Sequence, residues 1–420
     1  MIYFVLNSLN KIKKFPYFFL TPLVYAIGNA CEEIKIAQTY VLKRNKKLII
    51  LHPYNFTNFL NYKVCNQSLF NDLISFEENI FDKVLKKSLN FLVDKEFFFR
   101  RFFVLLLKKF TNKNLSKFNF PIIGIEQIFG TKKTILHNNK KFFEYDKIKK
   151  FSLVNSNFNL EKDKEKFCEK KLNSLKIPYD RLVLLHVRDD KYRNDRHRRD
   201  YRNSDINNYI ESIKHLIDKN YFVVRAGRKP SKKIDYNHKN FLDYSYLNLQ
   251  EDILDIFLMK KANLFIGTQS GILDLAQMFN KPILQTNMVE IFSKYPLKKN
   301  DRGIFKKIKK NNEELSISDF VKLNYIYHNP SNNLKDLSFY ENNQEQLFES
   351  LNEFLEIQEN PILTKKQIDF NNFLVKEHKK HFNKNPNELF TEYDSLKLLR
   401  LVKNTEGCLT NKNLSNLNFD

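Results

Sequence analysis

Arginine gathers in one stretch of a chain that otherwise uses lysine. The sequence has 71 lysine and arginine residues, of which 14 are arginine, and seven of those 14 lie between Arg181 and Arg202. A guanidinium group presents a planar fork of donors that can bind a phosphate or a carboxylate through two parallel hydrogen bonds, whereas an ammonium group is a point charge. We therefore expect this stretch to bind phosphate.

The arginine-rich stretch begins as a predicted strand. Residues 182–187 form a short apolar run rich in branched side chains, and His186, Arg188 and Asp189 then lead into a polar loop. Because open parallel sheets bind ligands beyond the carboxyl ends of their strands, these three side chains are candidate site residues. The alternative is a solvated, charged loop that follows a core strand.

A second candidate is the segment GTQSG at residues 267–271, which lies between a predicted strand and a predicted helix. Two of the eight glycines of the chain fall within it. Backbone N–H groups at a helix N-terminus, with the hydroxyls of Thr268 and Ser270, would form a cradle for an anion. The lysine and the spacing of a P-loop are absent. A tight turn that needs small residues for packing is the alternative.

The surrounding sequence alternates between strands and helices. Ser204 is a candidate N-cap for one of these helices. Such alternation predicts a parallel, doubly wound α/β sheet. The expected strands are 182–187, 221–224, 263–266 and 281–285, and the expected helices are 160–175, 205–219, 251–261 and 271–279.

The first part of the chain predicts a βαβ unit, with strands at 23–26 and 47–51 and a helix at 32–42. Gly28 and Asn29 form the expected tight loop before that helix, where Gly28 would let a ligand approach the backbone; an ordinary tight turn is the favoured alternative. A helical pattern follows from 59 to 110 and ends in FFFRRFFVLLLKKF, which fits either a membrane interface or a buried helix with charged ends. A short strand and loop are expected at 121–130.

The last part of the chain gives weaker signals. The basic run at 305–310 has the pattern of a solvated face. The remainder to about residue 400 is polar and helical, most clearly at 348–357, and the Asn-rich end from about 403 is expected to fray.

Composition sets outer limits on the interpretation. The 420 residues provide ample material for two or three domains, and the formal net charge of +23 would attract anionic partners of any kind. The cysteines lack the spacing of a zinc site and indicate a reducing compartment; they are Cys31, Cys65, Cys168 and Cys408. The apolar stretch at 15–27 is short and interrupted by two prolines, so we expect a soluble, cytoplasmic protein.

Several motifs together resemble those of a family of mostly uncharacterised bacterial glycosyltransferases of the GT-B type. They are LHVRD (185–189), YRN (201–203), VVRAG (223–227), DIFL (255–258), FIGTQSG (265–271), Pro282 and the pair Thr286–Asn287. HVR and IGTQSG are also loosely similar to the motifs of core-fucosylating and protein O-fucosylating transferases, but Asp189 stands where those enzymes have a second arginine.

The resemblance implies two Rossmann-like domains whose parallel sheets face a cleft, with a nucleotide-sugar between them and neither a metal nor another cofactor required. The expected boundaries are 1–157 for the acceptor-side domain, 158–335 for the nucleotide-sugar domain and 336–420 for a helical C-terminal extension.

The resemblance also implies roles for single residues. Arg188 would hold the pyrophosphate and stabilise the leaving nucleoside diphosphate, and Asp189 is the candidate catalytic base, with Glu32 and Glu33 as alternatives. Asp189 could equally be the ion-pair partner of a neighbouring arginine. The expected binding residues are His186, Tyr201, Asn203, Arg225, Gly227, Asp255, Gly267, Thr268, Ser270, Gly271, Asn287 and Gly28.

These expectations favour a glycosyltransferase of surface glycan or polysaccharide synthesis. Its partners would be a nucleotide-diphosphate sugar and a glycan or lipid-linked acceptor, with peripheral contact at the inner face of the membrane as an option and no nucleic acid. A sugar-nucleotide epimerase or phosphorylase of the same fold and a non-enzymatic, nucleic-acid-binding protein remain the alternatives.

Overall fold

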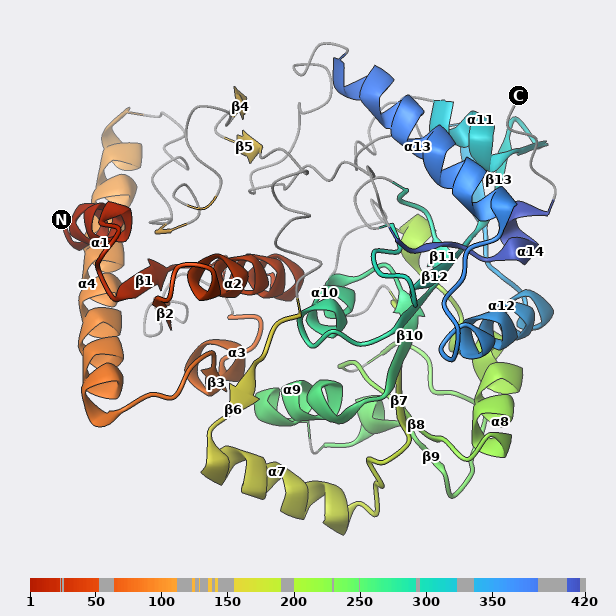
Figure 1. Ribbon diagram of the computed structural model, residues 1–420, viewed down its shortest axis with the longest axis horizontal. Helices are drawn as coiled ribbons and strands as arrows, with labels where there is room; N and C mark the ends of the chain where they lie inside the picture. The colour runs from red at the N-terminus through yellow and green to blue at the C-terminus, as the bar shows by residue number, and fades with distance from the viewer. Residues whose placement is uncertain are drawn as a thin grey trace.

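A seven-stranded sheet, parallel in every pairing, dominates the protein (Figure 1). Its order is β16-β12-β11-β10-β7-β8-β9. The predicted α/β class is therefore confirmed. The strands are β7 (Leu182–His186), β8 (Phe222–Arg225), β9 (Phe241–Leu242), β10 (Leu264–Thr268), β11 (Ile283–Met288), β12 (Arg302–Phe305) and β16 (Cys408–Leu409).

The computed structural model describes residues 1–22, 24, 26–52, 64–111, 123–124, 128, 135–137, 140–142, 155–189, 200–228, 230–248, 250–291, 295–322, 336–383 and 406–415.

Helices cover both faces of this sheet (Figure 1). Successive side chains of a strand point to opposite faces, so Leu182 and Leu184 of β7 belong to one hydrophobic cluster with α9 and α10, while Val183 and Leu185 belong to another with α8 and α12. The helices of this region are α7 (Lys162–Ser174), α8 (Ile210–Asp218), α9 (Asp252–Lys261), α10 (Gly271–Met278) and α12 (Gln344–Glu356), with short 3-10 turns at Asp200–Arg202, Ile206–Tyr209 and Tyr244–Tyr246. The expected N-cap at Ser204 is wrong, because Asp205 accepts the hydrogen bond from the Asn207 N–H (2.9 Å).

The order of the strands reverses between β7 and β10. The chain lays down β7, β8 and β9 in one direction, returns to place β10 on the other side of β7, and then continues outward through β11 and β12. The crossover helices α8 and α10 consequently lie on opposite faces of the sheet, as right-handed connections require. The chain segments that follow β7 and β10 therefore diverge at a topological switch point, which is where sheets of this kind bind ligands.

The N-terminal part contains the expected βαβ unit, but its first strand is displaced. Strand β1 (Tyr17–Leu20) pairs in parallel with β2 (Lys47–Ile50) across α2 (Ile27–Leu42). The prediction of a strand at 23–26 and of a helix start at residue 32 is wrong. The Asn10 side chain explains part of the difference, because it donates to the Phe19 carbonyl and accepts from the Phe19 N–H (2.8 Å each), which satisfies the backbone of β1.

The remaining N-terminal elements surround this unit. They are α1 (Ile2–Lys11), α3 (Ser68–Asn71), β3 (Leu73–Ile74), α4 (Ile80–Thr111), β4 (Ile135–His137), β5 (Lys140–Phe142) and β6 (Asn159–Leu160). Most of the strand and loop expected at 121–130 lies outside the described residues. Within the described ranges, no helix is both long enough and apolar enough to cross a membrane. All four cysteines are free thiols.

One hydrophobic core joins the N-terminal part to the large sheet. Phe18 and Ile34 belong to the same cluster as Phe257 and Ile283. The buried Lys35 ammonium group of α2 donates to the Gln277 carbonyl of α10 at 2.8 Å. The domain boundaries near residues 157 and 335 remain predictions.

The C-terminal part is more closely integrated into the fold than its sequence indicated. Residues 302–305 form β12 within the sheet, and Lys306 and Ile308 are buried, so a wholly solvated face at 305–310 is wrong. Residues 406–415 are not frayed, because Cys408 and Leu409 pair with β12 and are buried. Further elements are β13 (Lys307–Lys310), β14 (Glu313–Leu315), α11 (Ile317–Lys322), β15 (Leu337–Tyr340), α13 (Lys365–Asn383) and α14 (Asn411–Leu414).

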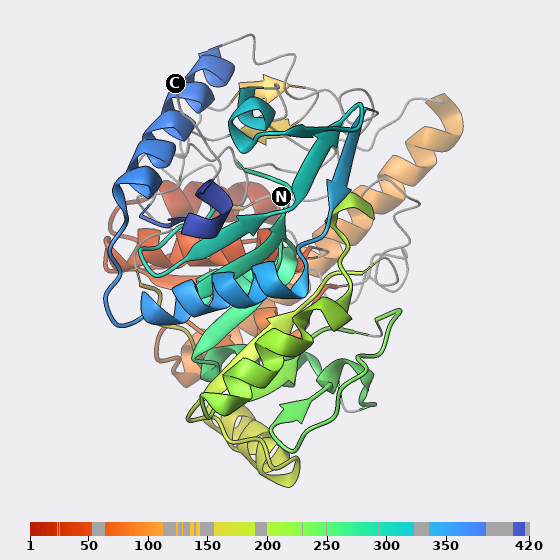
Figure 2. The same cartoon turned by 90° about the vertical axis from the view of Figure 1, so that its right-hand side faces the viewer.

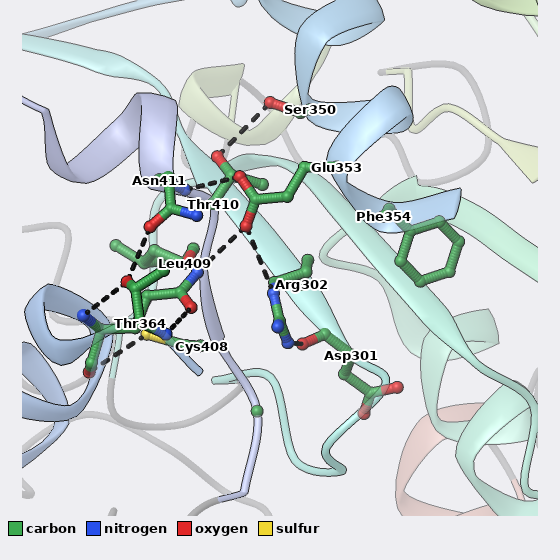
Figure 3. A network of polar contacts seen from close by, with 12 residues as sticks. Asp301, Arg302, Ser350, Glu353, Phe354, Thr364, Cys408, Leu409, Thr410 and Asn411 are labelled. Atoms are coloured by element: carbon green, nitrogen blue, oxygen red, sulfur yellow. Dashed lines mark hydrogen bonds and ion pairs between the residues drawn. The ribbon is translucent and has the colours of Figure 1, made fainter. Parts of the chain in front are cut away.

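A polar network fastens this C-terminal segment to the sheet (Figure 3). The Glu353 carboxylate on α12 lies 3.4 Å from Nε of the buried Arg302 and accepts hydrogen bonds from the Asn411 N–H (2.7 Å) and the Gln367 amide (3.0 Å). The same Gln367 amide donates to the Leu409 carbonyl at 2.8 Å. Glu353 therefore links β12, α13 and the segment that carries β16.

Substitution of Glu353 should reveal this linkage. We expect Glu353→Ala to lower the free energy of unfolding by about 2–4 kcal/mol, because it leaves the buried Arg302 guanidinium without its carboxylate. Glu349 lies one turn earlier on α12 and forms a half-exposed ion pair with Lys412 (2.9 Å), so Glu349→Ala should cost about 1 kcal/mol or less. Urea denaturation measures both values, and equal costs would contradict the assignment.

Candidate functional site

The candidate site is built where β7 and β10 end. The Arg188 N–H, two residues beyond β7, donates to the Thr268 hydroxyl at the end of β10 (2.9 Å). The Arg188 carbonyl accepts from the Ser204 N–H (3.0 Å), so the loop that leaves β7 returns to the same point. The Arg188 guanidinium, which is half-buried, donates to the side-chain carbonyl of Asn203. These contacts bring three of the expected residues together, namely Arg188, Asn203 and Thr268.

Lys306 adds a second cation that the sequence interpretation missed. Its ammonium group is buried after β12 and donates to the Asn203 backbone carbonyl at 2.5 Å. Burial lowers the pKa of Lys306 to about 8, while the Glu341 carboxylate opposes this shift. The sequence offered no clear signal for it, because Lys306 follows the short segment RGIF and is one of four lysines between residues 306 and 310. Arg188 and Lys306 thus bind the two carbonyl groups of one residue, and both can attract an anion.

The GTQSG segment is fixed by its central residue. The Gln269 side chain accepts hydrogen bonds from the N–H groups of Val289 (2.9 Å) and Glu290 (2.8 Å) and donates to the Glu290 carbonyl (2.6 Å). On the other side, the buried Arg202 donates to the Gln269 carbonyl and lies 3.4 Å from the Glu290 carboxylate. Gln269 and Arg202, neither of which was a candidate, therefore hold the loop in place.

Ser270 is the N-cap of α10, an eight-residue helix. The N-terminus of a helix carries a partial positive charge and exposes N–H donors. The start of α10 and Arg188 both adjoin the end of β10, since Arg188 is bonded to Thr268. Ser270 therefore lies at a helix N-terminus, as the sequence predicted, and the anion cradle itself remains a prediction.

Gly28 and Gly271 serve a packing role in the structure. They bring α2 and α10 into close contact: a Cβ on Gly28 would lie 2.9 Å from the Gly271 Cα, and a Cβ on Gly271 would lie 2.8 Å from the Ile27 Cγ2 and 3.0 Å from the Gly28 nitrogen. Any larger residue must force the helices apart. Gly271 therefore fits the alternative in which small residues are needed for packing, whereas Gly28 lies in the first turn of α2 and does not form the tight turn expected before a helix.

His186 lies at the end of β7 as a neutral side chain. Burial lowers the pKa of His186 to about 4, and its Nδ1 lies 3.2 Å from the Ala226 carbonyl. Because a carbonyl only accepts, the neutral ring carries its proton on Nδ1 and leaves Nε2 as an acceptor. Gly227 has a positive φ of 138° beside this ring, and a Cβ on Gly267 would lie 2.5 Å from the His186 carbonyl, so neither position tolerates a side chain.

The charged residues at the end of β8 and just after it form a separate group. Arg225 is buried and donates to the Asp243 carboxylate (3.0 Å) and the Lys232 carbonyl (2.9 Å). Arg228 pairs with Asp252 and with Asp255 (2.7 Å) at the start of α9. Burial raises the pKa of Asp255 to about 6, although Arg228 acts in the opposite direction.

The other candidates lie in different surroundings. The Asp189 carboxylate accepts from the Ser231 N–H (2.6 Å). Asn287 is buried in β11 and exchanges two hydrogen bonds with Asn342 (2.9 and 2.7 Å). The Tyr201 ring lies 5.4 Å from the Phe339 ring.

The alternative bases, Glu32 and Glu33, lie on α2, half-buried and buried respectively. In the part of the chain that the structure describes, no group of three or more His, Cys, Asp or Glu side chains is placed to hold a metal ion. The binding and catalytic roles of all these residues, and independence from metal, remain predictions.

Comparison with known proteins assigns no family. No family model matches the sequence, and no curated protein matches it. Among solved structures, the chain is similar to a family 9 glycosyl transferase from Veillonella parvula DSM 2008 (9% identity, TM-score 0.34, 64% of this chain and 80% of that one). It is also similar to E. coli ADP-heptose lps heptosyltransferase II (14%, 0.42, 81% and 99%). A third neighbour from Listeria monocytogenes is assigned as a UDP-N-acetylglucosamine 2-epimerase (9%, 0.24, 86% and 70%). These identities and TM-scores are too low to carry an activity over to this chain.

Lys306 should make anion binding depend on pH. A protonated Lys306 attracts phosphate and a neutral one does not, so affinity for a nucleoside diphosphate should fall as the pH rises through about 8, by at most about tenfold per pH unit. Lys306→Arg should bind without this decline, because arginine stays protonated. Lys306→Met should bind weakly at every pH. Calorimetric titration measures these affinities, and an unchanged decline in Lys306→Met would contradict the role.

Because α2 and α10 approach each other closely, a larger residue at Gly271 should lower the free energy of unfolding even without a ligand. Gly271→Ala should cost about 1–3 kcal/mol in unfolding free energy, because the new methyl group meets Ile27 and the Gly28 backbone. In an Ile27→Ala background the cost of Gly271→Ala should be smaller, since one of the two obstructing groups is gone. Denaturant unfolding of the four proteins in this cycle tests the prediction, which fails if both backgrounds give the same cost.

Proposed function

We propose that this protein is a glycosyltransferase that moves a sugar from a nucleotide-diphosphate sugar to an acceptor hydroxyl. The observation that carries the proposal is the position of two cations, Arg188 and Lys306, on the two carbonyl groups of Asn203 beside the switch point of a parallel sheet. Diphosphate is the ligand that this arrangement suits, because it presents several anionic oxygens to a guanidinium, an ammonium and a helix N-terminus at once.

The proposed chemistry begins with the leaving group. As the bond between the anomeric carbon and the diphosphate breaks, negative charge builds up on the phosphate oxygens. Arg188 and Lys306 would stabilise that charge, and they are already fixed in place by Asn203 and Thr268. Prior fixation matters, since groups that are already oriented need not reorganise during the reaction.

The acceptor hydroxyl would lose its proton to a carboxylate, for which we propose Asp189. This residue follows Arg188 directly and is half-buried, and its contact with the Ser231 N–H orients the carboxylate. His186, neutral with Nε2 as acceptor, would receive a hydrogen bond from a sugar hydroxyl. We assign Arg225 and Asp255 to positioning the nucleotide side of the site through their ion pairs with Asp243 and Arg228.

We further propose that the acceptor is a glycan or a lipid-linked glycan and that the reaction contributes to surface polysaccharide synthesis. The formal charge of +23 supports an anionic partner in general and does not select among the donors. The identities of the base and the sugar of the donor are to be determined by experiment.

Nucleotide binding by an arginine variant and a matched control tests the proposal. Arg188→Ala should weaken binding of the selected nucleoside diphosphate by roughly 10- to 100-fold, as expected for loss of charge-assisted hydrogen bonds. Arg181 precedes the same strand at its opposite end, exposed, with its guanidinium 4.7 Å from the Tyr221 ring centroid. Arg181→Ala removes the same charge and should leave affinity unchanged.

A thermal-shift screen of GDP, UDP, ADP, CMP and dTDP in buffer with EDTA would select the nucleotide, and calorimetry would then give the affinities. Equal affinity in the Arg188 and Arg181 variants would contradict the proposal. The proposal would also be contradicted if the protein bound none of the nucleotides but bound RNA with an affinity that falls steeply as the salt concentration rises.

A further inference from the structure

Helix α4 is apolar on two opposite sides. One side, with Leu89, Val93 and Phe97, is buried against the N-terminal unit. With a rotation of about 100° per residue, the other side carries a stripe of large, exposed apolar side chains. Its members are Phe81 (63% exposed), Val84, Phe91, Leu92, Phe99 (65%), Phe102, Phe103 and Leu106.

The exposed stripe is long and lies at the periphery of the protein. From Phe81 to Leu106 it extends about 37 Å at a rise of 1.5 Å per residue. Figure 1 shows α4 along an outer edge of the molecule, on the side away from the seven-stranded sheet, and in Figure 2 the C-terminal end of α4 projects beyond the other elements. Isolated apolar side chains on a surface are ordinary, but eight large apolar side chains along one side of a helix mark an interaction surface, even though Ser88 and Lys95 lie among them.

Two carboxylates, the buried Asp82 and the half-buried Glu96, bind the N-terminal part and fix the helix so that the stripe faces outward. Asp82, in the first turn, accepts hydrogen bonds from the Tyr17 hydroxyl and the Lys47 ammonium group (2.8 Å each). Halfway along, Glu96 accepts from the Tyr3 N–H (2.9 Å) and from Arg100. The third carboxylate of α4, Asp94, is also buried. The acidic groups of α4 therefore face the protein.

The charges that border the stripe are basic. Lys87 and Lys95 are exposed on or beside the stripe, whereas Lys83 lies farther round the helix, 3.4 Å from the Glu161 carboxylate. Lys95 lies within the stripe itself, with its ammonium nitrogen 5.3 Å from the Phe91 ring centroid. A long lysine stem can cover apolar surface while its charge reaches outward. A second copy of this chain would place lysine opposite lysine, which disfavours self-association through this face.

We propose that the outer face of α4 docks, in the plane of the membrane, on an anionic lipid bilayer. Phenylalanine and leucine side chains would enter the boundary between headgroups and acyl chains, and the lysines would contact the phosphates of the headgroups. The 32-residue helix would lie on the bilayer and not span it, in keeping with its charges. This inference is independent of the proposed transferase activity.

Vesicle binding tests the inference. The full chain is mixed with vesicles of phosphatidylcholine and phosphatidylglycerol in a two-to-one ratio, or of phosphatidylcholine alone, and bound protein is measured by flotation. Phe91→Glu and Phe99→Glu should each reduce binding to the mixed vesicles roughly tenfold or more, because a charge replaces a buried apolar group. Lys87→Gln and Lys95→Gln should each reduce it about fivefold.

Ile362→Glu is the matched control. Ile362 lies between α12 and α13 and is as exposed as Phe99, at 65%. Its replacement by glutamate introduces the same negative charge as the phenylalanine variants. Unchanged binding in this variant, with unchanged melting temperatures throughout, supports the docking face. The inference is overturned if the parent chain does not bind the mixed vesicles, or if Ile362→Glu reduces binding as much as Phe99→Glu does. It is also overturned if the parent chain forms a dimer that the phenylalanine variants abolish and no vesicle binding is detected.

Discussion

The hydrogen bond from the Arg188 N–H to the Thr268 hydroxyl joins the two strands between which the order of the sheet reverses. Because the connections after β7 and β10 leave toward opposite faces, their first residues must be held by contacts between the two loops themselves. Thr268 supplies one such contact and the Arg202 bond to the Gln269 carbonyl a second, while the bond from Arg188 to Asn203 closes the β7 loop on itself. Together they turn two diverging loops into one fixed surface on which Arg188 and Lys306 are close neighbours.

The centre of this sheet could be predicted from the sequence because its signals are local. A strand buried on both faces reads as an unbroken apolar run, and a polar residue directly after such a run must lie at the carboxyl edge. Both conditions hold for Leu182–His186 followed by Arg188, and for Leu264–Thr268 followed by Ser270. The phosphate-binding role of Arg188 rests on the scarcity of arginine elsewhere in the chain and remains a prediction.

The parts that the sequence did not predict depend on distant residues. Strand β16 has two residues, too few for any periodicity, and it becomes a strand because β12, about a hundred residues earlier, presents its free edge. Lys306 looked like one lysine in a solvated run, and only the burial of β12 and the carbonyl of Asn203 distinguish it. Gly28 and Gly271 each looked like a ligand-binding turn, whereas their contact with one another belongs to the packing of α2 on α10.

The most direct test of the account is a crystal structure with a bound nucleoside diphosphate. The account predicts that the diphosphate lies at the carboxyl edge of β7 and β10, with its oxygens within about 3 Å of the Arg188 guanidinium and the Lys306 ammonium group. A diphosphate bound at another edge of the sheet, or one that leaves both cations on Asn203 without contacting either, would contradict it.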